Sequence, residues 1–131
     1  EGIVRMTKRN VKSLVWPIWV RGVLFAAALF AFVMAILPHP PHLMPYDPGD
    51  KVQHMVTFAV LAALARLAYL QTSALAIFVR LSAFGAVIEL AQAIPALHRD
   101  ADIWDWIADS AAILAVLAIA GLARFVRTGR F

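Results

Sequence analysis

The stretch that decides the fold is Gly22–Leu37, GVLFAAALFAFVMAIL, in which no side chain carries a charge or a hydrogen-bonding group. The next five residues, 38–42, read PHPPH, and proline ends a helix because it has no amide hydrogen and its ring clashes with the preceding turn. Extended back to Pro17, the apolar run predicts a membrane-crossing helix over 17–37. A cleaved signal peptide is the competing interpretation. We expect an uncleaved anchor.

Three more apolar stretches follow, each too long and too rich in alanine and leucine for a β-strand. They predict helices over 51–70, 74–94 and 103–126. Residues 1–15 are expected to form a basic cytoplasmic arm, and residues 127–131 a basic tail. The expected fold is therefore all-α: an integral membrane four-helix bundle of two hairpins, spanning 16–126, with both termini in the cytoplasm.

The composition of the 131-residue chain supports a membrane protein. Hydrophobic residues make up 63% and charged residues 15%, whereas soluble domains have about 45–50% and about 25%. A chain this small cannot bury such an excess in one core, which argues against a soluble enzyme and a disordered chain. Cysteine is absent, so disulfides, thiolate metal sites and cysteine nucleophiles are excluded.

The basic residues indicate the orientation. With the N-terminus in the cytoplasm, ten of the 12 basic residues fall on the cytoplasmic side and only Lys51 and Arg99 lie outside, as the positive-inside rule requires. The net charge of +4 is thus a topology signal, and no nucleic-acid partner is expected. The aromatic residues near the two interfaces agree: Trp16, Trp19 and Tyr69 inside, and Tyr46, Trp104 and Trp106 outside. We therefore predict a multi-pass protein of the bacterial inner membrane.

The acidic residues show the opposite distribution, because all except Glu1 fall in the outer half. Glu89 precedes Pro95 by six residues, which places it about 9 Å below the end of its helix. His54 follows Asp50 by one turn, and Asp109 follows Asp105 by one turn. A charge facing lipid costs about 2.5–3.5 kcal/mol, so these groups should face the bundle interior or a water-filled pocket.

Two interpretations of this polar cluster stay open. In the first, the cluster is structural and fixes the register of the helices. In the second, it forms a functional pocket, in which His54 pairs with Glu89 or Asp109 and Arg99 reaches a carboxylate. No metal or cofactor is expected, because only His54 lies deep in the cluster. A catalytic pair of Glu89 and His54 is chemically feasible, but no nucleophile motif accompanies it. His39 and His42 flank prolines in a loop and are expected to be solvated.

At these residues the chain resembles a known family. The run Asp50–Phe58, DKVQHMVTF, followed by ELAQ ending at Gln92 and then by Arg99 and Asp105, is similar to the VanZ-like family of small bacterial membrane proteins. The resemblance covers about residues 50–117 and matches the first helix by hydropathy alone. The chain departs from the family at Asp109, where asparagine is usual, and at Ala112, where glycine is frequent. The polar positions carried over are Asp50, Lys51, His54, Glu89, Gln92, Arg99 and Asp105, with Asp109 added from the sequence pattern.

The family is named for a member associated with resistance to the glycopeptide teicoplanin. The resemblance implies an extracytoplasmic pocket that binds or modifies an envelope component, plausibly one linked to a lipid. The alternative is an accessory subunit without chemistry of its own, which fills or stabilises a larger membrane complex. A transporter would need several copies of so small a bundle. The expected partners are the lipid bilayer, a lipid-linked ligand, and a larger complex or further copies of the chain. Whether the protein is an enzyme stays open.

Overall fold

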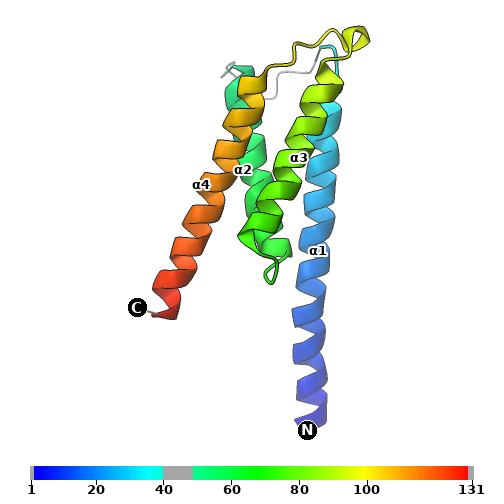
Figure 1. Ribbon diagram of the computed structural model, residues 1–131. Helices are drawn as coiled ribbons and strands as arrows, with labels where there is room; N and C mark the ends of the chain where they lie inside the picture. Colours follow the sequence, from blue (N-terminus) through cyan, green and yellow to red (C-terminus); the bar gives the residue numbers. More distant parts are fainter. Residues whose placement is uncertain (1, 40–48, 130–131) are drawn as a thin grey trace.

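The computed structural model describes the backbone of residues 2–39 and 49–129, and their side chains from Ile18 onward (Figure 1). This part of the chain is all-helical, as predicted, with four α-helices and one short 3₁₀ helix. The elements are α1 (Gly2–Ile36), α2 (Asp50–Ala68), α3 (Ala74–Gln92), η1 (Pro95–Leu97) and α4 (Ile103–Thr128). Each α-helix contains a segment long and apolar enough to cross a membrane.

The main difference from the predicted boundaries lies in α1. The helix was predicted to begin at Pro17, but it begins at Gly2 and runs through the proline without a break. An internal proline removes one backbone hydrogen bond, and helical residues can still continue on both sides of it. The segment 1–15, predicted as an arm, is therefore helical from Gly2 onward.

The other boundaries shift by one or two residues. Helix α2 ends at Ala68, where the Tyr69 amide donates to the Ala65 carbonyl, and α3 ends at Gln92, ahead of Pro95. Helix α4 continues to Thr128 and is ended by Gly129, whose φ of 58° is left-handed. The predicted loop residues His42, Tyr46 and Asp47, and the tail residue Arg130, lie outside the described residues.

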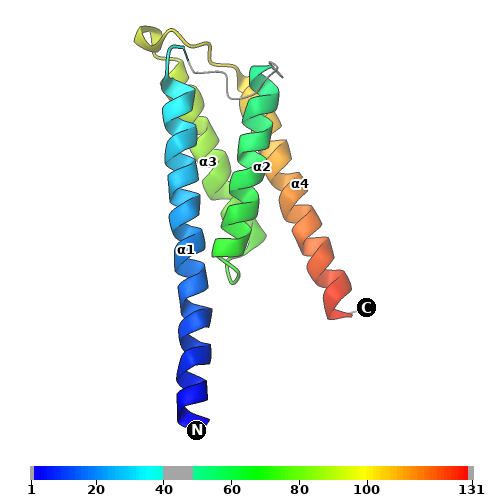
Figure 2. The same cartoon turned by 180° about the vertical axis from the view of Figure 1, so that it is seen from behind.

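The helices are arranged around α2, which packs on α1, α3 and most extensively on α4. Figures 1 and 2 show the start of α1, the end of α4 and the α2–α3 turn at one end of the bundle. We call this the turn end, and define it by residues 66–73 and Arg21. The opposite end, where 93–102 leads into α4 and α2 begins, is called the loop end. Towards the turn end α4 leans away from the bundle, and residues 121–129 are all exposed.

The core lies between the two ends and is formed by small and large apolar side chains in contact. Ala62 and Ile113 are fully buried, and Phe58, Leu61 and Ile88 nearly so. Helix α3 packs closely on α2 and α4 at Gly85. A Cβ atom there would lie 3.3 Å from the rings of both Phe58 and Trp106. The absence of a side chain at this position lets α3 lie close to both neighbouring helices.

Candidate functional site

The first turns of α2 and α4 are joined by charged side chains at the loop end. Lys51 bonds Asp105 closely, and its Nζ also lies 3.5 Å from Oδ2 of Asp102. Asp102 is the N-cap of α4, since its Oδ1 accepts a hydrogen bond of 2.9 Å from the Trp104 amide. Such a cap fixes the first turn of a helix. Capping and the lysine bridge together hold Asp105 towards α2.

One turn deeper, His54 and Asp109 form a buried pair. His54 Nδ1 lies 3.4 Å from Asp109 Oδ2, and the residues are 9% and 1% exposed. Phe58 lies one turn further along α2 and is almost fully buried. Oδ1 of Asp109 is buried and has no hydrogen-bond partner among the described residues. Of the two partners predicted for His54, the structure therefore selects Asp109 and not Glu89.

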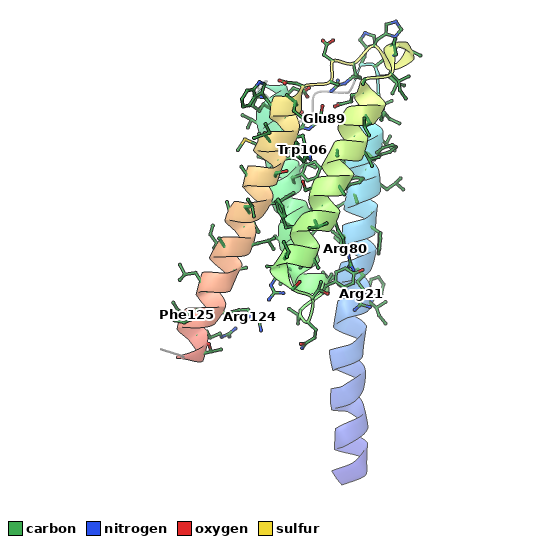
Figure 3. The ribbon with its side chains drawn as sticks, in the orientation of Figure 1. Arg21, Arg80, Glu89, Trp106, Arg124 and Phe125 are labelled. Carbon is green, nitrogen blue, oxygen red and sulfur yellow. The ribbon has the colours of Figure 1, made fainter. Side chains whose placement is uncertain are left out.

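Glu89 joins the cluster from α3 by a different route. Its Oε2 accepts a hydrogen bond of 2.9 Å from the Asp102 amide, so it holds the start of α4 against α3. Its Oε1 is buried and unpartnered within the described part of the chain. Figure 3 shows Glu89 at the loop end, with Trp106 next to it on the neighbouring helix. Trp106 donates from Nε1 to the Ser82 carbonyl at 3.0 Å and adds a second link between α3 and α4.

Arg99 comes down from the loop to a carboxylate, as predicted, and that carboxylate belongs to Asp50. The guanidinium Nη2 lies 3.3 Å from Asp50 Oδ2, and the Arg99 side chain is 13% exposed whereas that of Asp50 is 56% exposed. The pair connects the loop before α4 with the first residue of α2. Among the described residues, the guanidinium makes this one hydrogen bond, although it has five N–H donors.

A pocket of about 280 Å³ opens beside these groups, between α1 and α2. Its polar end is formed by Asp50, Gln53, His54 and Arg99. Its long wall is apolar: α1 contributes three alanines together with Phe30 and Met34, and α2 contributes mainly Val56, Val60 and Leu61. The three alanines are Ala27, Ala31 and Ala35. The pocket therefore runs from ionisable groups at the loop end to hydrocarbon within the span.

The predicted site residues thus divide into two groups. The structure brings together Asp50, Lys51, His54, Arg99, Asp105 and Asp109, and Glu89 is joined to them through Asp102. Gln92 takes no part: it is 2% exposed, and its Nε2 donates to the Ala35 carbonyl on α1 at 3.1 Å. His98 is exposed, and its ring lies 3.1 Å from the Ala96 carbonyl of its own loop. Gln92 is therefore a helix-packing residue, and His98 lies outside the cluster.

Sequence reasoning missed two features of the site. Asp102 was grouped with the acidic residues but not with the pocket, although an aspartate directly before an apolar helix is a recognised N-cap signal. The pocket wall on α1, at Ala27 and Ala31, was missed because no periodic signal distinguishes it in a helix that is apolar all round. A partly buried hydroxyl pair, Ser82 and Ser110 at 3.0 Å, also links α3 to α4.

Three donor groups at the loop end are close enough to hold a metal ion. Ligand atoms of Asp50, His54 and Asp105 all lie within 4.8 Å of one another. Asp50 and His54 come from consecutive turns of α2, and Asp105 from the first turn of α4. The set contains one imidazole and two carboxylates, which is a donor set that transition metals accept.

Polar groups at the turn end make a different kind of contact. Arg21 Nε lies 3.4 Å from the Ala68 carbonyl, and its guanidinium is 4.8 Å from the centre of the Tyr69 ring. Arg66 donates to the Leu70 and Thr72 carbonyls at 3.4 and 3.1 Å. Here arginines satisfy the carbonyl groups that a helix leaves open at its end. Arg21 and Arg80 are visible near this end in Figure 3.

Four apolar helices with a polar cluster at one end suggest a multi-pass membrane protein. No protein-family model, curated protein or solved structure matches the chain.

Proposed function

We propose that this is an inner-membrane protein of the VanZ-like type whose loop-end pocket binds an amphiphilic envelope component carrying a lipid chain. One observation carries the proposal: the pocket is polar at the loop end and apolar along α1 and α2. An amphiphile has the same division, with a hydrated head group and a hydrocarbon chain. The pocket matches both parts of such a ligand.

The polar end supplies groups suited to a head group. Arg99 uses one hydrogen bond on Asp50, so further N–H donors can reach a phosphate or a sugar hydroxyl. Gln53 and Asp50 add amide and carboxylate groups at the same end. Recognition of the head group by these side chains and of the chain by the α1–α2 wall is the binding mode that we propose.

Retention of lipid during purification tests this binding mode. Ala27→Phe places a ring in the pocket wall, and the matched control Ala26→Phe adds the same ring to an exposed neighbour on α1. After purification in a mild detergent, bound lipids are extracted and quantified by mass spectrometry. We expect the parent chain and Ala26→Phe to retain an amphiphile that Ala27→Phe loses. Equal retention by both variants would contradict the proposal.

The alternative function, an accessory subunit of a larger complex, is favoured by the exposed part of α4. Ile119, Leu122, Phe125 and Val126 are all more than half exposed. The same purification separates the two functions. A protein that co-migrates at fixed stoichiometry, with no retained amphiphile, would support the subunit.

The proposed orientation is tested by labelling single cysteines in the otherwise cysteine-free chain. Gln71→Cys lies in the α2–α3 turn and Ala96→Cys in η1, and both positions are exposed. In intact cells, a membrane-impermeant reagent should label position 96 and leave position 71 unlabelled. The reverse pattern would invert the topology and place the pocket in the cytoplasm.

A further inference from the structure

We propose that Asp50, His54 and Asp105 form a binding site for one divalent transition-metal ion, of the class represented by Zn²⁺. Their ligand atoms lie within 4.8 Å of one another, on two helices that pack together. The pocket is the one proposed above to bind an amphiphile. A role of the ion in holding that ligand rests on the proposed function, whereas binding of the ion does not.

The three donor atoms are almost as close to a common centre as the ligands of a bound zinc ion are. Atoms at the corners of a 4.8 Å triangle lie roughly 2.8 Å from its centre, and zinc bonds to nitrogen and oxygen are roughly 2.0–2.2 Å long. Each donor atom therefore moves inward by less than about 1 Å when the ion binds, which is within the reach of a side-chain rotation.

His54 has a carboxylate partner on one ring nitrogen, as histidines that bind metals commonly do. Its Nδ1 lies 3.4 Å from Asp109 Oδ2, so a proton on Nδ1 is donated to that carboxylate. The lone pair is then on Nε2, which is the nitrogen available to an ion. A carboxylate behind a histidine in this way fixes the tautomer and the ring orientation at most metal sites that use histidine. We therefore assign Asp109 as the positioning residue.

A second observation is the excess of negative charge around and behind His54. Asp109 is 1% exposed and faces His54, yet its Oδ1 has no partner within the described ranges. Within the described residues, five carboxylates at the loop end are accompanied by two permanent cations, Lys51 and Arg99. The five are Asp50, Glu89, Asp102, Asp105 and Asp109. Uncompensated buried charge is costly in a membrane, and a divalent cation reduces it.

The donor set selects the class of ion. Calcium takes six to eight oxygen ligands, whereas one imidazole and two carboxylates provide the three protein ligands of an open zinc site. Two of the three donors, Asp50 and His54, also line the pocket, so the proposed ion site borders it. Lys51, whose side chain is 47% exposed, is free to leave Asp105 as the ion enters.

Calorimetric titration of the full chain in detergent, after treatment with EDTA, tests the site with Zn²⁺ alone. We expect one saturable equivalent for the parent chain. We expect at least a hundredfold weaker binding for His54→Gln and parental binding for the control His98→Gln, a histidine outside the cluster. Asp109→Asn should weaken Zn²⁺ binding by about 10–100-fold, while the melting temperature of this variant in EDTA stays close to that of the parent. Ca²⁺ should not bind to the parent or to any variant.

Asp50→Asn keeps the test decisive if His54→Gln does not fold, because Asp50 is exposed and the asparagine Oδ1 can still accept the hydrogen bond from Arg99. It should weaken Zn²⁺ binding at least tenfold, whereas Asp100→Asn, an exposed loop control, should not. Absence of saturable binding, or equal affinity of parent and both site variants, would overturn the metal site. Since these titrations measure binding of the ion and not retention of lipid, that result would leave the Ala27→Phe test of the proposed function unaffected.

Discussion

The two ends of the bundle use polar side chains in opposite ways. At the turn end, Arg21 and Arg66 bond backbone carbonyls within or next to the α2–α3 turn. At the loop end, charged side chains bond one another across helices, as in the pair of His54 with Asp109. All of the acidic residues that the structure describes lie at the loop end or in the loop leading to it.

The difference separates a structural end from a candidate functional one. Arginines at the turn end satisfy backbone groups that a helix end leaves open, so a structural role accounts for those contacts. At the loop end, one buried oxygen of Glu89 and one of Asp109 have no partner among the residues that the structure describes. Unsatisfied buried polar atoms are few in native proteins and call for an explanation such as an unfilled binding site.

The largest stability effect is expected at Gly85, where the packing under the loop end is tightest. Gly85→Leu drives a side chain into the rings of Phe58 and Trp106 and should cost roughly 3 kcal/mol, the upper part of the range for overpacking. Gly22→Leu is the matched control, because a Cβ atom there meets nothing within 4 Å. Thermal unfolding in detergent measures both. Equal melting temperatures would show that the helices do not meet as described.

The next effect concerns the buried pair. His54→Leu leaves the Asp109 carboxylate without its one hydrogen-bond partner in the described structure and should cost about 2 kcal/mol. His98→Leu, at an exposed position, should change stability by less than about 0.5 kcal/mol. If the two variants have the same melting temperature, His54 and Asp109 do not form the interhelical pair.

A smaller effect is expected at the turn end. Arg66→Gln removes the bonds to the Leu70 and Thr72 carbonyls, which are accessible to water, and should cost about 1 kcal/mol. Arg124→Gln, on the exposed part of α4, should be neutral. Neither change should reduce lipid retention. Loss of retained lipid in Arg66→Gln would remove the distinction between the two ends.

The sequence was sufficient to predict the helices and the end of the bundle at which the polar groups gather. Apolar length predicted four membrane-crossing helices, and the cost of a charge in lipid predicted that His54, Asp105 and Asp109 face inward. Helical spacing does not determine pairing, because His54 had two carboxylates within reach and the choice depended on how α2 and α4 pack. Gln92 was assigned to the pocket because the family resemblance carried it over, but its side chain donates to the Ala35 carbonyl on α1.

The features that could not be predicted depend on contacts between distant segments. Asp102 becomes part of the site because its amide meets Glu89 from another helix. The apolar wall of the pocket exists because α1 and α2 leave space between Ala31 and Leu61. Neither contact has a signature in a single stretch of sequence.

Glu89 provides the most direct test that the loop end serves binding. Glu89→Gln keeps an oxygen to accept from the Asp102 amide and alters the oxygen that has no partner, so the fold should lose less than about 0.5 kcal/mol. Melting temperature and retained amphiphile are measured on the same detergent preparation, with the parent chain and Ala26→Phe as references. Glu89 does not line the pocket but holds the Asp102 amide beside its polar end, so the account predicts an unchanged melting temperature together with reduced retention of the amphiphile. A large drop in melting temperature, with retention intact in the folded fraction, would contradict it and make Glu89 a structural residue.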